Sequence, residues 1–145
     1  MNWGKWSHSW KVRQGRVAEG IIFRRLRRRL PNVARMKYHH PFDILVGTAR
    51  IEVKQRNPNK SGHWTFPLPK KKSRRNKIDF YVFQLDAKDR RRVHVVIPSP
   101  VSGASITITR SDLKGKFAHC IDNWGIINGL GLTTKPSRSA GFRGA

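Results

Sequence analysis

The stretch PFDILVGTARIEVKQ, residues 41–55, decides the fold because it contains two strand patterns separated by a short turn. FDILV is a compact apolar run that ends at Gly47, and ARIEVKQ alternates apolar and charged residues with the period of a strand. A hairpin between them brings Asp43 close to Glu52 and Lys54, if Asp43 shares their face. Charges inside apolar runs lower stability unless an opposite charge or a metal ion binds them.

The segment before this stretch, residues 15–31, predicts a helix that ends at a proline. At about 100° per residue its apolar side chains form one stripe and its arginines fall outside it. The stripe consists of Ile22, Phe23, Leu26 and Leu30. Glu19 projects into the middle of this stripe. Two interpretations stay open: a glutamate near the helix start, which the helix dipole favours, or a buried carboxylate that binds an arginine or a metal ion.

The charge balance indicates a polyanionic partner. The chain has 31 Lys and Arg against 8 Asp and Glu, a formal net charge of +23. Basic side chains that neutralise phosphates release counterions, which drives association, so nucleic acid is the expected partner. No apolar run approaches the roughly 18 residues of a membrane span, and the N-terminus lacks a signal-peptide pattern. We therefore expect no membrane association and a cytoplasmic location, beside the nucleoid or in the host cytoplasm if a phage encodes the chain.

Length and composition favour one folded domain, because 145 residues with 37% hydrophobic content suffice for one modest core. We expect an N-terminal arm at 1–14, a single domain at 15–130 and a flexible basic tail at 131–145. The arm contains Trp3, Trp6 and Trp10, which either pack on the domain or stack on bases. The tail is rich in Gly, Ser and Arg and is expected to order on nucleic acid.

Later segments predict the remaining core. IDFYVFQL at 78–85 reads as a central strand, and RVHVVIP at 92–98 should pair with it. ITIT at 106–109 predicts a short strand. A helix is expected from near Ser111 or Asp112 to Gly125, with its apolar face on the sheet. Cys120 lies on that face and is interpreted as an inert core thiol.

Residues 56–77 contain three prolines and no helical period, so they predict an ordered or mobile basic loop. Aromatic residues interrupt its basic side chains, and two interpretations stay open. The loop either grips a nucleic-acid backbone while its aromatic rings stack or wedge, or it is a solvated charge run over a packed aromatic pair. The candidate nucleic-acid contacts are Lys60, His63, Trp64, Lys70, Lys71, Lys72, Arg74 and Arg75.

Three carboxylates and a lysine gathered in so basic a chain indicate a metal site. Mg²⁺ takes oxygen ligands and keeps several waters, so two or three carboxylates suffice to hold it against a phosphate. The ion lowers the pKa of a bound water, and a neighbouring lysine can orient or deprotonate that water. The pattern therefore predicts phosphodiester hydrolysis.

Asp43, followed after a hairpin by Glu52-Val53-Lys54, with Glu19 on a preceding helix, resembles the PD-(D/E)XK nuclease superfamily over about residues 15–98. Gln55 and the later strands are similar to its Holliday junction resolvase and intron homing endonuclease branches. The resemblance implies an α/β fold of the restriction-endonuclease type, a mixed β-sheet flanked by helices. It implies Mg²⁺, replaceable by Mn²⁺, and a set of site residues. Metal ligands are Asp43, Glu52 and the Val53 carbonyl with Glu19 outside them, and Lys54 and Gln55 complete the catalytic set.

The expected function is that of a metal-dependent DNA endonuclease. Branched DNA such as a Holliday junction is the favoured substrate, because the sequence shows no separate recognition module. Cutting such a junction takes two active sites, hence a homodimer. The alternatives are a site-specific homing or restriction-type endonuclease, and a non-enzymatic basic nucleic-acid-binding protein whose carboxylates form ion pairs with arginines.

Overall fold

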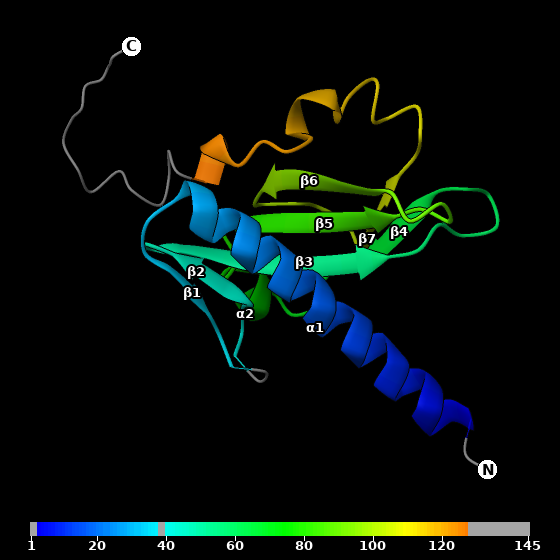
Figure 1. Ribbon diagram of the computed structural model, residues 1–145, viewed down its shortest axis with the longest axis horizontal. Coiled ribbons are helices and arrows are strands. Elements are labelled where there is room, and N and C mark those ends of the chain that lie inside the picture. Colours follow the sequence, from blue (N-terminus) through cyan, green and yellow to red (C-terminus); the bar gives the residue numbers. More distant parts are fainter. Residues whose placement is uncertain (1–2, 38–39, 128–145) are drawn as a thin grey trace.

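The computed structural model describes residues 3–37 and 40–127, and the predicted flexible tail lies outside them. A long helix, α1 (Trp3–Arg29), comes first and crosses one face of a sheet, with its N-terminal part extending past the sheet (Figure 1). The helix thus begins inside the segment expected to be a separate arm. The side chains of the three arm tryptophans lie outside the described part of the chain, so neither interpretation of them is tested.

The main sheet has five strands in the order β1-β2-β3-β5-β6. They are β1 (Val33–Arg35), β2 (Ile44–Val46), β3 (Ala49–Arg56), β5 (Phe80–Asp86) and β6 (Arg92–Pro98). All neighbours are antiparallel except β3 and β5, which run parallel. Gly47, at a φ of 59° that favours glycine, turns β2 into β3. The predicted hairpin and the predicted pairing of 78–85 with 92–98 are confirmed.

Each face of this sheet has its own cover. Phe80 and Val82 of β5 pack toward α1, while Tyr81 and Phe83 pack on a second, two-stranded sheet. That sheet consists of β4 (Trp64–Pro67) and β7 (Ser105–Ile108). Because both faces of β5 are covered, nearly all its residues are buried. The fold is therefore mixed α/β, as expected, but strands rather than a helix cover the second face.

The helix expected at 111–125 is wrong. The structure has successive turns there and one short 3-10 helix, η1 (Ala118–Cys120). The Asp112 carboxylate accepts from the Thr109 N–H, and the Asp112 N–H in turn donates to the Thr109 hydroxyl. These local hydrogen bonds close a turn and compete with a helix. Cys120 is nevertheless buried, and burial raises the pKa of its thiol, as expected of an inert core cysteine.

The basic loop is ordered and contains β4 and a four-residue helix, α2 (Lys72–Arg75). It returns the chain from the end of β3 to the start of β5, because parallel neighbours need such a crossover. Trp64 is 3% exposed, donates from its ring nitrogen to the Asp86 carbonyl and has Arg110 over its ring. A ring so enclosed cannot stack on a base, so packing accounts for Trp64. None of the helices in the described residues is both long enough and apolar enough to cross a bilayer.

Candidate active site

The hairpin places Asp43, the residue just before β2, against the edge of β3. The Asp43 N–H donates to the Ile51 carbonyl, and its carboxylate Oδ2 accepts from the Val53 N–H at 2.7 Å. β2 begins at Ile44, which pairs with Ile51, whereas β3 continues past Ile51 to Arg56. The Asp43 carboxylate therefore occupies the position where a longer β2 would have continued the ladder.

The Val53 carbonyl lies at the same edge. The N–H and C=O groups of one residue point to the same side of a strand. Since the Val53 N–H points to Asp43, its carbonyl also faces the edge that β2 has left. A backbone oxygen and a carboxylate thus meet beside β3, as the predicted ligand set requires.

Glu52 and Lys54 lie on the sheet face opposite Val53, because side chains alternate along a strand. Glu52 is 2% exposed. Its Oε2 is 3.3 Å from the Lys54 Nζ and 3.5 Å from the Arg74 Nη2. A buried carboxylate is thus bridged by one cation from its own strand and one from α2.

Glu19 approaches from the helix side of the sheet. Its side chain accepts from Arg16 at 2.7 Å, lies 3.6 Å from the Arg35 guanidinium, and is nearly buried. Since α1 begins at Trp3, Glu19 lies far outside the first turn, and the helix-dipole interpretation is wrong. The remaining interpretation is a buried carboxylate that binds cations.

One hollow of about 640 Å³ unites these groups. Glu19, Asp43, Glu52, Val53 and Lys54 all line it. The structure therefore brings together residues from a helix, a strand end and a second strand that were predicted to converge. Four residues that line the hollow were not among the predicted site residues: His40, Pro41, Ser73 and Lys77. Of these, Lys77 could have been expected, because it belongs to the basic segment at 56–77.

The two glutamates of this hollow are more deeply buried than the cations paired with them. Burial, and then the Asp43 carboxylate, raise the pKa of Glu52 to about 7, although Lys54 and Arg74 lower it. Burial and then Asp43 also raise the pKa of Glu19, against Arg16 and Arg35. Asp43 is thus the common anionic neighbour of both glutamates. The ion pairs of the two glutamates do not offset the effect of burial on their pKa values. A further cation bound between them would lower both pKa values.

The donor set fits a hard divalent cation in its chemistry. In the described residues no three His, Cys, Asp or Glu side chains are arranged to hold a metal ion. Glu52 is turned to Lys54 and Arg74, and Asp43 accepts from the Val53 N–H. The implied set is smaller: two carboxylates and one backbone carbonyl, all oxygen ligands, with water completing the coordination.

The structure does not bring Gln55 into this hollow. As the next residue after Lys54, Gln55 points to the opposite face of β3, where its amide donates to the Asp86 carboxylate at 2.6 Å. Asp86 also accepts from Gln84, whose carbonyl oxygen is 2.9 Å from the His94 Nε2. Gln55 therefore belongs to a polar network between strands.

The predicted nucleic-acid contacts divide among several surfaces. Arg74 lines the candidate active site. Lys70, Lys72 and Arg75 line a second hollow across α2, and Lys60 lines a third together with the buried Trp64. Lys71 is exposed just before α2, and His63 is half-buried. The loop therefore presents lysines and arginines on both sides of α2 rather than as one patch.

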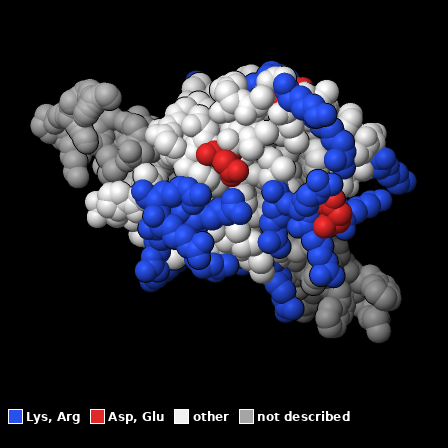
Figure 2. Space-filling view, turned by 45° about the horizontal axis from the view of Figure 1, so that its top comes forward, with Lys and Arg blue, Asp and Glu red and all other residues white. Residues whose placement is uncertain are grey.

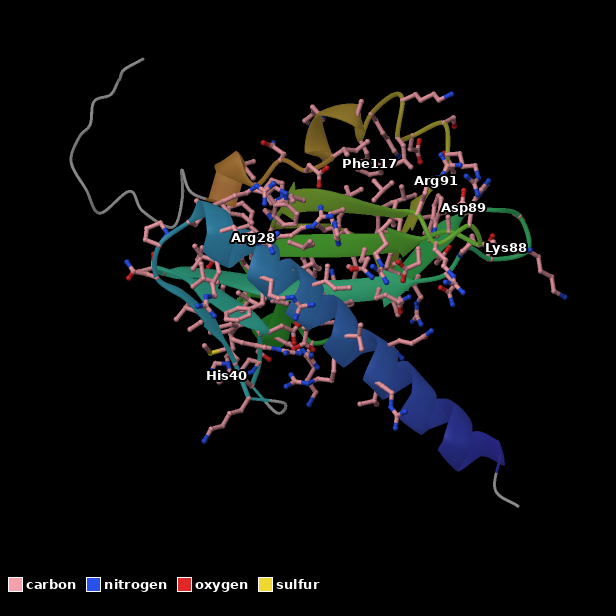
Figure 3. All side chains as sticks on the ribbon, viewed as in Figure 1. Arg28, His40, Lys88, Asp89, Arg91 and Phe117 are labelled. Atoms are coloured by element: carbon pink, nitrogen blue, oxygen red, sulfur yellow. The ribbon has the colours of Figure 1, made fainter. Side chains whose placement is uncertain are left out.

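Comparison of the chain with protein-family models, curated proteins and solved structures finds no match. Geometry and charge therefore carry the functional argument. Lys and Arg side chains gather in groups over the face shown in Figure 2, where Asp and Glu are few. The last turn of α1 is also basic, and its Arg28 is labelled in Figure 3. Arg24, Arg27, Arg28 and Arg29 are all exposed. A surface of this kind attracts a polyanion.

Proposed function

We propose that the chain is a metal-dependent DNA endonuclease with a restriction-endonuclease-like fold. One observation carries the proposal: Asp43, Glu52 and Lys54 line a single basic-rimmed hollow, in which burial and the neighbouring Asp43 raise the pKa of Glu52 to about 7. A site built only for stability would place fewer carboxylates together, because each raises the free energy of ionising its neighbour. Phosphodiester hydrolysis is the chemistry that such groups serve in a protein of net charge +23.

The carboxylates, the Val53 carbonyl and Lys54 have separate roles in this proposal. Asp43, Glu52 and the Val53 carbonyl would hold Mg²⁺, with Mn²⁺ able to replace it because both take oxygen ligands. The bound ion supplies charge stabilisation at the scissile phosphate and lowers the pKa of a water. Lys54, which lies 3.3 Å from Glu52, would donate a hydrogen bond that orients the attacking water. Glu19 stands outside the ligands.

The cations at the rim of the hollow would bind the DNA substrate. Arg74 and Lys77 lie on the α2 side of the hollow, where they would contact phosphates next to the cleaved bond. The described residues contain no separate recognition module, which favours selection by DNA structure and hence branched DNA.

Cutting both strands of a junction takes two copies of the site, so we propose a homodimer on DNA. Light scattering of the protein with a four-way junction tests this: one copy per junction contradicts it.

A second candidate is a non-enzymatic nucleic-acid-binding protein. The ion pairs favour it: Glu52 is bridged by Lys54 and Arg74, and Glu19 by Arg16 and Arg35. In this case the buried carboxylates only form structural ion pairs with the partly exposed basic side chains around them. Such a protein binds DNA and cuts none.

Cleavage assays separate the two candidates. Labelled linear, nicked, flapped and four-way-junction DNAs would be incubated with Mg²⁺, Mn²⁺ or EDTA. Wild type should cut in a metal-dependent way, whereas Glu52→Gln and Lys54→Ala should bind without cutting. Asp89→Asn is the matched control, because Asp89 pairs with Arg91 at the β5–β6 turn, far from His40 at the site (Figure 3). Tight binding by all proteins with no metal-dependent cut would leave only the binding protein.

A further inference from the structure

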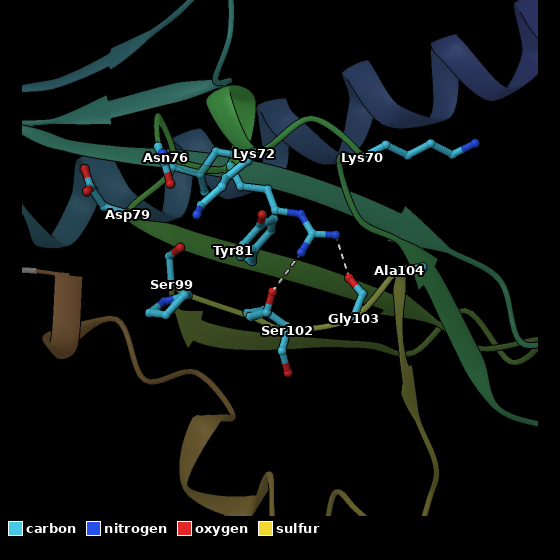
Figure 4. A pocket seen from close by; sticks show the side chains of 13 residues that line it. Lys70, Lys72, Asn76, Asp79, Tyr81, Ser99, Ser102, Gly103 and Ala104 are labelled. Carbon is cyan, nitrogen blue, oxygen red and sulfur yellow. Dashed lines mark hydrogen bonds between the residues drawn. The ribbon is translucent and has the colours of Figure 1, made fainter.

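A second hollow of about 1210 Å³ lies on the other side of α2 from the candidate active site (Figure 4). The short helix and the residues after it serve both cavities. Ser73, Arg74 and Lys77 line the active-site hollow, whereas Lys72 and Arg75 line the second one. A DNA strand that leaves one hollow across α2 therefore meets the other.

The floors of the two hollows are also neighbours. Glu52 of β3 and Tyr81 of β5 are paired in register, and adjacent strands are about 4.8 Å apart. Tyr81 lines the second hollow, and Glu52 lines the first. After burial, the Glu52 charge is the main cause that raises the pKa of the Tyr81 hydroxyl, which places the two groups close together. The hollows therefore adjoin along this residue pair and along α2.

Arg75 holds the second hollow in shape. Its guanidinium donates to the backbone carbonyls of Pro69, Val101 and Gly103. The hydrogen bonds to the 101–103 segment are drawn in Figure 4, and this segment is also joined to the one at Pro69 by the hydrogen bond from the Leu68 N–H to the Ala104 carbonyl. Three charge-assisted hydrogen bonds from one planar guanidinium fix both segments. The cavity is therefore preformed, with a positive charge built into its wall.

The lining of this hollow matches a nucleotide. Pro100 and Ala104 are exposed there and Val101 is half-buried, so these side chains offer an apolar surface on which a base can pack, and Asn76 adds an amide at the rim. Lys70 and Lys72 are exposed there and suit a phosphate. An apolar cavity with a few polar groups is the usual form of a small-ligand site, and base packing with backbone cations is how proteins hold single strands.

We propose that this second hollow binds an unpaired nucleotide of the same DNA strand whose phosphate lies in the candidate active site. The inference rests on the proposed function and specifies its substrate. A base inside an uninterrupted duplex is stacked and paired, and its extrusion costs a few kcal/mol, whereas a gap, flap or junction presents a free base. The cavity thus selects DNA with an unpaired nucleotide beside the cleaved bond.

Binding without metal tests the proposal independently of cleavage. In EDTA, anisotropy and 2-aminopurine emission would compare a paired duplex with a gapped duplex that leaves one 2-aminopurine unpaired. Ala104→Trp fills the cavity from an exposed lining position, and Ala118→Trp is its control on η1. Wild type should prefer the gapped DNA, and Ala104→Trp should lower that preference about tenfold, about 1.4 kcal/mol, while Ala118→Trp leaves it unchanged.

A charge-matched pair of double variants gives a second readout. Lys70→Ala with Lys72→Ala removes two charges at the rim, and Lys114→Ala with Lys116→Ala removes two exposed charges elsewhere. Both weaken binding in low salt, but only the first should lower the preference for gapped DNA. Equal binding of both DNAs by wild type overturns the proposal, as does an unchanged preference in folded Ala104→Trp. Either result leaves the proposed nuclease function intact if wild type cuts DNA and Glu52→Gln does not. Conversely, a preference of wild type for gapped DNA without any cleavage supports the nucleotide-binding cavity and contradicts the nuclease function.

Discussion

Replacing Glu52 by glutamine should make the folded protein more stable above neutral pH while it abolishes cleavage. Glu52 is 2% exposed, and burial followed by the Asp43 charge raises its pKa from 4.5 to about 7, despite Lys54 and Arg74. A carboxyl with a raised pKa stabilises the fold fully below the unfolded value, and this contribution is lost as pH rises through about 7. The shift corresponds to about 3 kcal/mol at about 1.36 kcal/mol per unit. Glutamine keeps the shape without the charge.

Urea unfolding followed by tryptophan fluorescence measures this effect. The variant should gain about 3 kcal/mol over wild type at about pH 8 and less than about 1 kcal/mol at about pH 5. The difference between the two proteins is the quantity to follow, because His94, with a pKa lowered to about 4, opposes Glu52 in the wild-type profile. Asp89→Asn, an exposed carboxylate, should show no such gain at high pH.

The opposite sign at high pH would refute the reasoning. A Glu52→Gln variant that is less stable than wild type at about pH 8 would mean that Lys54 and Arg74 outweigh burial and Asp43. The carboxylate would then be a structural ion pair, as in the non-enzymatic alternative. Mg²⁺ gives a further check, since it should stabilise wild type above neutral pH more than the variant.

Other predictions concern the rest of the fold. Burial lowers the pKa of His94 to about 4, so protonation of His94 should cost wild type about 3 kcal/mol between about pH 6.5 and about pH 4, a loss that the opposite effect of Glu52 offsets. His94→Gln should therefore gain about 3 kcal/mol over wild type in urea titrations across that range, and equal pH profiles of the two proteins contradict this. Asp79 accepts three hydrogen bonds from Arg50, and Asp79→Ala should cost about 1–3 kcal/mol, which an unaltered urea midpoint would disprove. Cys120 should react with a thiol reagent only as fast as the chain opens, whereas rapid labelling of the native protein would show an accessible thiol. Ile22→Ala should cost about 2–5 kcal/mol, because the side chain is fully buried between α1 and the sheet, and a smaller loss in thermal or urea unfolding would mean that α1 packs loosely.

The parts of the fold that sequence predicted correctly have strong local patterns. The β2–β3 hairpin has two strand patterns around a glycine, and β5 is a long apolar run with a partner of the same kind in β6. The convergence of Asp43 with Glu52 and Lys54 follows from that hairpin. Glu19 joins them because its carboxylate interrupts an apolar helix stripe, which is unfavourable without a nearby cation.

The parts that sequence missed depend on distant partners or on competing local bonds. β4 contains Pro67 and is stabilised by pairing with β7, which comes some forty positions later in the chain. The expected C-terminal helix has good cap residues, but Thr109 and Asp112 use the same groups to close a turn. The position of Gln55, by contrast, was readable: strand alternation alone puts it opposite Lys54.

Because β3 and β5 are parallel neighbours, residues 57–79 must return along the sheet before the second strand can begin. This return path contains α2 and nearly all the cations that line the two hollows. The proposed metal ligands belong instead to the β2–β3 hairpin, and Glu19 belongs to α1. Under the proposed function, DNA recognition and cleavage are thereby encoded in separate stretches of the sequence. Insertions or exchanges in the return path should then alter what the protein binds without shifting the register of β3 on β5. A chimaera that receives this stretch from another basic sheet protein should keep the proposed cutting groups and acquire a new preference for DNA shape.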